Sequence, residues 1–257
     1  MTVAGLTIRW FAIEAARERA TLAAILGVDI PDRGPVDIPG LRLEIVAPGT
    51  GRTRGRLDVA GTAPGAPTIL LAPPSAETAV EAGVVGAAEP DTDEVAVGLA
   101  LERFAGPTRQ APSSARFLAL GWATVDLERA AARWPGVRWR TAPRDSLVGA
   151  RALVGRTGTP VEPASAERVA GDGTTLVLLE PDAEGRLAAA LARQGEGPAA
   201  LYVLVPRDAI RAIEPRVARL GVRFIAGSGP FGSAWATAGL DASGPTVIVV
   251  PGAVPDD

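Results

Sequence analysis

Histidine and cysteine are both absent from the 257 residues of this chain. Without cysteine there are no disulfides and no thiol nucleophiles, and without histidine there are no Ser-His-Asp triads and no imidazole metal sites. A metal would need carboxylate or carbonyl oxygens, which suit Ca²⁺ or Mg²⁺. The acidic stretch EPDTDE at 89–94 lies among Gly, Ala and Pro, which favours a solvated loop instead. We therefore expect no metal and no cofactor.

Aromatic residues, basic blocks and long apolar runs are also scarce. Aromatics make up 4% of the chain and the net charge is −3, so the basic patch that nucleic-acid binding needs is missing. No run approaches the ~18 apolar residues of a membrane span, and the first 20 residues do not read as a secretory signal. With 47% hydrophobic residues the chain is typical of a globular protein. We expect a cytoplasmic protein, monomeric or homodimeric, that binds neither nucleic acid nor membrane.

Extended apolar runs alternate with helix-like runs in a repeating order. Each of four units opens on an extended run and continues with a helical stretch and further extended runs; the opening runs are 6–13, 67–73, 115–125 and 199–205. A strand, a helix and several strands form a βαβββ module, and such repeats define an architecture. Because one module cannot close its own sheet, modules are expected to pair. The prediction is an α+β fold in which tandem βαβββ modules form curled mixed sheets around a cleft.

The units divide the chain into two halves. The N-terminal half is predicted at 1–108, with a short second module, and the C-terminal half at 115–252, with two modules; RQAPSS at 109–114 is the expected linker. Helices are predicted at 14–27, 126–136 and 207–221, with a further helical run, EGRLAAALARQ, between the third and fourth units. Asp126 is a candidate N-cap.

The third and fourth units resemble the vicinal oxygen chelate superfamily, which includes glyoxalase I, extradiol dioxygenases and antibiotic-sequestering proteins. The resemblance is carried by LGWATVDLERAAARW, GARALVG and the long stretch from LVLLEPDAEG to ALYVLV, and it covers most of 115–250. The Gly-Glu-Gly turn at 195–197 is similar to the epimerase branch. The resemblance implies a curled sheet with a central metal site.

It also implies metal ligands on the first and last strands of each paired module, often His and Glu. Aligned on Asp126 and on the Gly-Glu-Gly turn, the four ligand positions fall at Ala119, Val177, Ala200 and Ile248, or at Val247 after a one-residue shift. Alkyl side chains offer no lone pairs, and dehydrating a cation among them would be costly. The four are interpreted as degenerate metal positions, so the metal chemistry of the family is not expected here.

Six residues are candidates for contacting a ligand, and no residue is assigned a catalytic role. Strand alternation places Tyr202 on the same face as Ala200, where it either meets a ligand or fills the space of the missing metal. The other candidates are Trp235 after a Gly-rich loop, Arg151 in an apolar run, and three strand residues, Glu44, Thr175 and Thr246. Packing for Trp235 and solvation for Arg151 are the competing interpretations. Glu44 falls at the Glu position of the first unit, opposite Thr7, where an ion pair with Arg9 would also explain it.

Three functions remain open. The first is a metal-free protein that binds a small organic molecule in an apolar cleft. The second is a metal-independent enzyme of the isomerase or lyase type, with a carboxylate or Tyr202 as acid or base. The third is a degenerate structural domain that binds no ligand.

Overall fold

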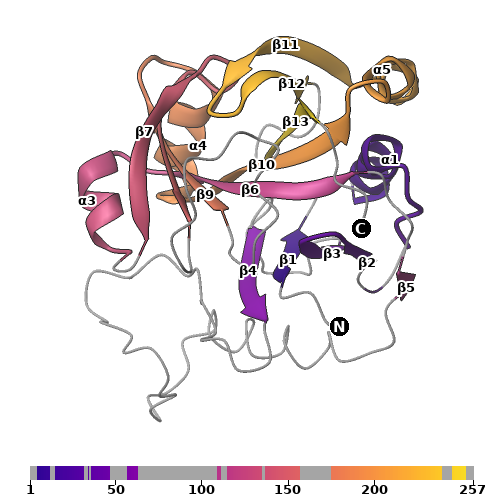
Figure 1. Cartoon of the computed structure of the whole chain (residues 1–257), viewed down its shortest axis with the longest axis horizontal. Helices are drawn as coiled ribbons and strands as arrows, with labels where there is room; N and C mark the ends of the chain where they lie inside the picture. Colours follow the sequence, from indigo (N-terminus) through magenta and orange to yellow (C-terminus); the bar gives the residue numbers. More distant parts are fainter. Residues whose placement is uncertain are drawn as a thin grey trace.

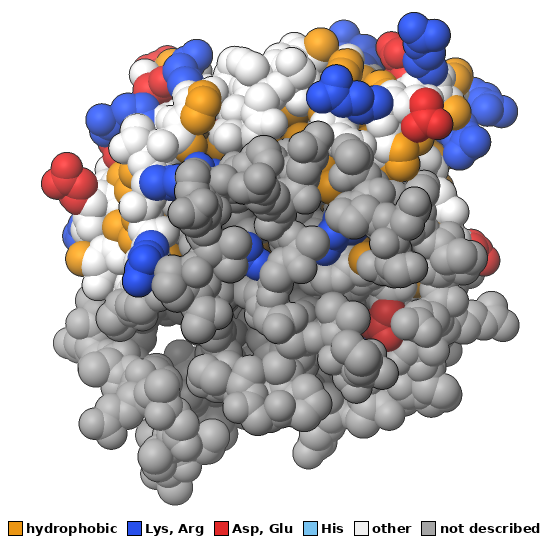
Figure 2. Space-filling model, viewed as in Figure 1, with side chains coloured by type: hydrophobic (Ala, Val, Ile, Leu, Met, Phe, Trp, Pro, Cys, Tyr) orange, Lys and Arg blue, Asp and Glu red, His pale blue; other side chains and the backbone are white. Residues whose placement is uncertain are grey.

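The computed structural model describes residues 5–11, 15–31, 34, 36–46, 57–62, 109–110, 115–134, 137–156, 175–238 and 245–252. These residues form an eight-stranded sheet, a five-stranded sheet and four helices (Figure 1). No described helix is both long and apolar enough to cross a membrane. On the face shown in Figure 2, the basic side chains that are coloured lie dispersed among acidic and hydrophobic ones.

The larger sheet consists of two βαβββ modules. The first contains, in chain order, β6 (Arg116–Ala123), α3 (Leu127–Ala132), β7 (Arg138–Asp145), β8 (Ala150–Arg156) and β9 (Thr175–Pro181). The second contains β10 (Gly197–Pro206), α5 (Ile210–Ala218), β11 (Arg223–Gly229), β12 (Gly232–Ala238) and β13 (Thr246–Gly252). Between the modules lies α4 (Arg186–Gln194). Both modules match the third and fourth units predicted from the sequence.

The strand order is β11-β12-β13-β10-β6-β9-β8-β7, which is symmetric about the central pair. There β6 and β10, the first strands of the two modules, run antiparallel. In each module the first strand is parallel to the last, β6 to β9 and β10 to β13. This is the paired-module topology of the vicinal oxygen chelate fold, so the predicted fold class is confirmed.

Alternating side chains divide this sheet into an outer and an inner face. On β10, Leu201, Val203 and Val205 belong to the outer hydrophobic cluster, together with residues of α3 and α5. Ala200, Tyr202 and Leu204 belong to the inner cluster, which also contains Leu187 and Leu191 of α4. The inner face is therefore covered by α4, and the outer face by the module helices.

The two edge strands, β7 and β11, come into contact where β7 ends. The Ser146 backbone N–H, just after β7, donates to the Ser228 carbonyl of β11 at 2.8 Å. The Ser228 N–H donates in return to Ser146 Oγ at 2.9 Å. A Cβ atom on Gly227 would lie 2.6 Å from Leu147 Cδ2, so this approach requires glycine at 227. We refer to this contact as the Ser146–Ser228 clasp.

The smaller sheet has the order β4-β1-β3-β2-β5. Its elements are β1 (Gly5–Phe11), α1 (Ala15–Leu26), β2 (Val36–Ile38), β3 (Leu41–Val46), β4 (Leu57–Thr62) and β5 (Arg109–Gln110). The predicted first unit is present as β1, α1 and β3, with β1 parallel to β3. The sequence did not predict β2 or β4, and β5 forms from the first two residues of the expected linker. The rest of that linker, and the whole of the predicted second unit, which opens at 67–73, lie outside the described residues.

The N-terminal elements pack on the outer face of the larger sheet. Leu22 and Ile25 of α1 and Leu43 of β3 share one hydrophobic cluster with Leu201 and Val203 of β10. The Arg17 side chain of α1 donates to the carbonyls of Leu220 and Gly221, which follow α5, at 3.2 and 3.1 Å. The two sheets thus share one core.

Candidate functional site

The four residues interpreted from the sequence as degenerate metal positions come together on the inner face of the larger sheet. Ala119, Val177, Ala200 and Ile248 are each 0% exposed and belong to one cluster. Tyr202 pairs in register with Ala119 on one side and with Ile248 on the other. Val247 faces the outer cluster, so Ile248 is the inner-face residue of β13. The donor set does not fit a divalent cation, because none of the four side chains carries a lone pair.

Tyr202 fills the space between these positions. Its side chain is 0% exposed, and its ring meets the ring of Phe231 edge to face at 5.3 Å. A Cβ atom on Gly121 would lie 3.2 Å from Tyr202 Cε2 and 2.7 Å from Ala200 Cβ. The centre of the inner face is therefore closely packed, with no room for a ligand between these residues.

The hydroxyl of Tyr202 donates to a buried carboxyl, Asp145 Oδ2, at 2.7 Å. Asp145, at the end of β7, is also 0% exposed, and its Oδ1 accepts the backbone N–H groups of Leu147 and Val148 at 2.9 and 3.3 Å. Burial raises the pKa of Asp145, while the hydrogen bonds from Tyr202 and the backbone act in the opposite direction. Burial, followed by the nearby Asp145 charge, raises the pKa of Tyr202 well above its usual value. The pair lies behind the Ser146–Ser228 clasp.

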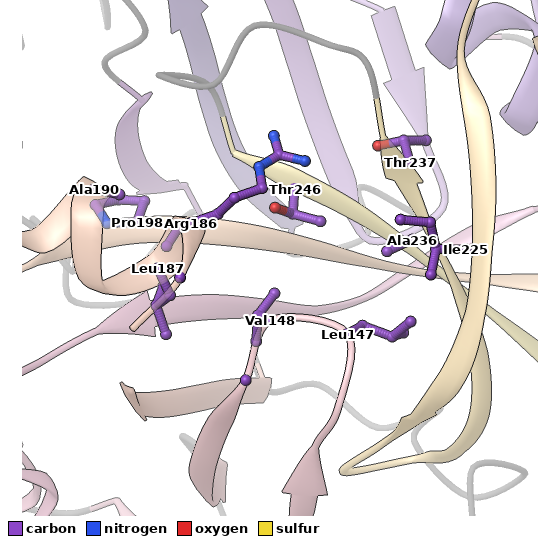
Figure 3. A pocket seen from close by; sticks show the side chains of 13 residues that line it. Leu147, Val148, Arg186, Leu187, Ala190, Pro198, Ile225, Ala236, Thr237 and Thr246 are labelled. Atoms are coloured by element: carbon purple, nitrogen blue, oxygen red, sulfur yellow. The ribbon is translucent and has the colours of Figure 1, made fainter. Parts of the chain in front are cut away.

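A pocket of about 250 Å³ opens beside this packed centre, between α4 and the ends of several strands (Figure 3). Its walls are mostly apolar, with Leu147 and Val148 from the turn after β7, Leu187 and Ala190 from α4, and Ala236 from β12. Pro198 and Ala199, directly after the Gly-Glu-Gly turn, also line it. Among the described residues that line it, the polar side chains are those of Arg186, Thr237 and Thr246, and none is acidic.

Of the six ligand candidates, Thr246 lies at this pocket. Tyr202 and Thr175 are buried on the inner face but do not line it. Trp235 packs against the outer cluster, on the opposite side of β12 from Ala236. The Arg151 side chain is 63% exposed and pairs with Glu180. Glu44 lies on β3 in the other sheet, in register with Arg9.

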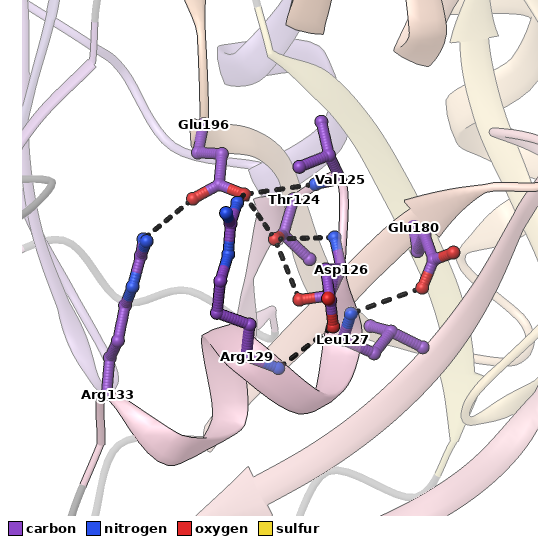
Figure 4. A network of polar contacts seen from close by, with 8 residues as sticks. All are labelled: Thr124, Val125, Asp126, Leu127, Arg129, Arg133, Glu180 and Glu196. Carbon is purple, nitrogen blue, oxygen red and sulfur yellow. Dashed lines mark hydrogen bonds and ion pairs between the residues drawn. The ribbon is translucent and has the colours of Figure 1, made fainter.

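The Gly-Glu-Gly turn has a structural role that the sequence did not reveal (Figure 4). Glu196 Oε1 accepts from the Thr124 hydroxyl at 2.7 Å, the Val125 N–H at 3.1 Å and Arg129 at 3.1 Å, and Oε2 accepts from Arg133 at 2.8 Å. Burial would raise the pKa of Glu196, but the hydrogen bonds from Thr124, Val125 and Arg129 and the charge of Arg133 outweigh it and lower the pKa. The turn thereby ties the start of the second module to the helix of the first.

Within that same network the N-terminus of α3 is capped from two sides. Asp126 accepts the Arg129 N–H at 2.9 Å, which confirms the predicted N-cap. Glu180 of β9 accepts the Leu127 N–H at 3.1 Å. Among the described residues there is no group of three or more acidic side chains that could hold a metal.

Sequence reasoning missed Arg186, Asp145 and Glu196. Arg186 opens a helix that the sequence predicted, but the sequence does not show that this helix crosses the inner face. Asp145 sits at a strand end, where a single acid is ordinarily solvated. A carboxylate in a turn just before an apolar strand was the available signal for Glu196.

The fold and site together define a protein of two paired βαβββ modules, with a packed inner face and a pocket beside α4. No protein-family model matches the chain, and no curated protein matches it.

Solved structures do match. One is a Streptomyces coelicolor methylmalonyl-CoA epimerase variant in complex with 2-nitronate-propionyl-CoA, at 20% identity over 55% of this chain and 98% of that one, with a TM-score of 0.42. Another is methylmalonyl-CoA epimerase from Mycobacterium tuberculosis, at 23% identity over 56% and 93%, with a TM-score of 0.42. A third, methylmalonyl-CoA epimerase in complex with methylmalonyl-CoA and NH4+, matches at 20% identity over 56% and 100%, with a TM-score of 0.43. The activity in these names is that of those proteins.

Proposed function

We propose that this protein binds a small, mostly apolar organic molecule without a metal ion, in the pocket beside α4. The observation that supports this most directly is the pocket itself, whose walls are apolar and which carries a few polar groups on one side. Ligand sites commonly combine apolar walls with a small number of convergent polar groups.

The packed centre of the inner face explains why binding is proposed beside it. Tyr202 and the four alkyl positions leave no space and no lone pairs where the family resemblance implies a metal. The pocket of about 250 Å³ is smaller than the ~300–1,000 Å³ of sites for drug-sized ligands. A ligand of modest size follows from that volume.

The alternative is a metal-independent isomerase or lyase. The observation in its favour is the buried Asp145–Tyr202 pair, because Leu147 and Val148, which donate to Asp145, also line the pocket. Buried groups with shifted pKa values are common at catalytic sites. In this alternative the Ser146–Ser228 clasp opens so that the pair meets the substrate.

The binding proposal is tested by a thermal-shift screen of the full chain against small apolar metabolites, followed by substitution of Ala190. Ala190→Leu adds three carbon atoms to the pocket wall and is expected to abolish the stabilisation by any hit. Ala192→Leu, an exposed position on the same helix, is the matched control and should leave the shift unchanged. Hits that stabilise Ala190→Leu as well as wild type would place binding elsewhere, and a screen without hits would favour the structural domain.

Elemental analysis of the purified protein tests the metal-free part. We expect Ni, Co, Zn and Fe well below one atom per chain. Any of these metals at one atom per chain, retained after dialysis, would contradict the proposal.

A further inference from the structure

Among the described residues of the pocket wall, Arg186 is the charged one. It is the first residue of α4, it is exposed, and its side chain extends from the helix toward Thr246 (Figure 3). Among the described residues it makes no hydrogen bond or ion pair. A guanidinium beside an apolar wall is available to a ligand.

Several other arginines of the larger sheet and its helices are already paired. Arg144 binds Asp182 and Arg151 binds Glu180, while Arg129 and Arg133 both bind Glu196. Asp182, the acid four residues before Arg186, is therefore engaged elsewhere. Glu184, two residues before Arg186, makes no ion pair with it. The positive charge at the pocket is not neutralised by the described part of the chain.

Thr246 adds a second polar group. It is half-buried, it lines the same pocket, and no hydrogen bond from its hydroxyl to a described residue is present. Thr237 donates to the Val247 carbonyl at 3.4 Å, so its hydroxyl proton is already used. Among the described residues of the pocket, the side-chain donors left for a ligand are thus one guanidinium and one hydroxyl.

From this arrangement we infer that the pocket binds the carboxylate of a small apolar organic acid, with Arg186 pairing with the carboxylate and Thr246 donating to it. A planar guanidinium matches a carboxylate in a two-bond geometry. Leu147, Val148, Leu187 and Ala236 then contact the hydrocarbon part of the acid. A phosphate monoester carries more charge than one arginine balances, and the part of the lining that the structure describes offers no second cation. The inference rests on the proposed function and specifies its ligand.

Matched pairs of acids and amides test it on the full chain. The probes are hexanoate with hexanamide, and phenylacetate with phenylacetamide, with hexyl phosphate as a third head group. Titrations followed by NMR give the Kd of each. In the wild type we expect each acid to bind about tenfold more tightly than its amide, because a hydrogen bond to a charged group is roughly twice as strong as a neutral one.

Arg186→Gln removes the charge and keeps most of the side-chain length. It should abolish the preference for the acid while leaving the Kd of the amide unchanged. Arg211→Gln, at an exposed position of α5 that does not line the pocket, should retain the preference. Thr246→Val should raise the Kd of the acids more than the Kd of the amides.

The outcomes separate the inference from the function it rests on. If the amides bind as tightly as the acids, and Ala190→Leu abolishes the binding of both, the inference is overturned and the proposed function still stands. A preference for hexyl phosphate over hexanoate would also overturn it. Absence of binding by all five probes and by the wider screen would overturn both.

Discussion

Tyr202 fills the centre of the inner face of the larger sheet and provides its buried hydrogen bond. Its ring separates the degenerate metal positions from Phe231, and its hydroxyl supplies the hydrogen bond that the buried Asp145 Oδ2 accepts. The face on which Tyr202 lies could be predicted from its neighbours, because strand alternation is a local property. Its partner could not, because Asp145 lies 57 residues away and only the folded, curled sheet brings the two side chains together.

Replacing Tyr202 with Phe should destabilise the protein more at pH 7 than at pH 4. Burial raises the pKa of Asp145, and the hydrogen bond from Tyr202 lowers it in part. Removing that hydrogen bond should therefore raise the pKa of Asp145 further. A carboxyl whose pKa is raised in the folded state loses stability as the pH rises through that pKa. The charged form suffers most from the lost donor, at a cost of about 1–3 kcal/mol. Urea unfolding at the two pH values measures the difference.

The control for this prediction is the same substitution in an Asp145→Asn background. Asparagine does not ionise, so Tyr202→Phe should then cost a similar amount at both pH values. An equal cost at pH 4 and pH 7 in the Asp145 protein would show that this carboxyl is not the source of the effect.

At the scale of elements, the Gly-Glu-Gly turn and α3 act as one unit across the two modules. The sequence predicted α3, its N-cap and the turn, because each depends on neighbouring residues. It did not predict that Glu196 would receive donors from Thr124, Arg129 and Arg133, which lie 63 to 72 residues earlier. Long-range polar contacts of this kind follow from the central pairing of β6 with β10.

We expect Glu196→Gln to lower the free energy of unfolding by about 1–2 kcal/mol at pH 7, because charged hydrogen bonds are replaced by neutral ones. The pKa of Glu196 is lowered in the folded protein, so its contribution is present above the unfolded glutamate pKa of ~4.3 and is lost as the pH falls through the lowered value. Denaturation curves should show that the difference in free energy of unfolding between variant and wild type is smaller at pH 3 than at pH 7. Glu214→Gln, on the exposed side of α5, should show no gap at either pH.

The helix α4 shows where prediction from the sequence ends. The run EGRLAAALARQ predicted it, and the structure places it at Arg186–Gln194. Which surface a helix covers depends on how the chain connects it to the sheet, and the local sequence does not specify that. The pocket lies where the chain between the two modules crosses the inner face, and its described lining includes Thr246 but none of the other five predicted contacts.

At the scale of the whole molecule, the smaller sheet repeats part of the plan of the larger one. In β1 and β3 the register pairs Arg9 with Glu44, so Thr7 lies two positions before the partner of Glu44. Ala200 likewise lies two positions before Tyr202, the partner of Ile248. The first unit therefore follows the same spacing as the fourth. The strand β4 was not predicted; it runs antiparallel to β1, as β10 runs antiparallel to β6. The division into halves at 1–108 and 115–252 stays a prediction.

The shared core predicts that the two halves unfold together. Leu22 and Leu43 are each 1% exposed and belong to the same cluster as Leu201 and Val249 of the larger sheet. A fragment of residues 115–252 would expose that outer face to water, and large exposed apolar patches promote aggregation. We expect this fragment to aggregate, or to melt at a far lower temperature than the full chain.

Leu22→Ala in the full chain should lower the free energy of unfolding by about 2–5 kcal/mol. It should shift a single melting transition, which can be followed by near-UV circular dichroism because most of the Trp residues lie in 115–252. Two separate transitions, with the later one unaffected by Leu22→Ala, would instead show that the C-terminal half is stable on its own.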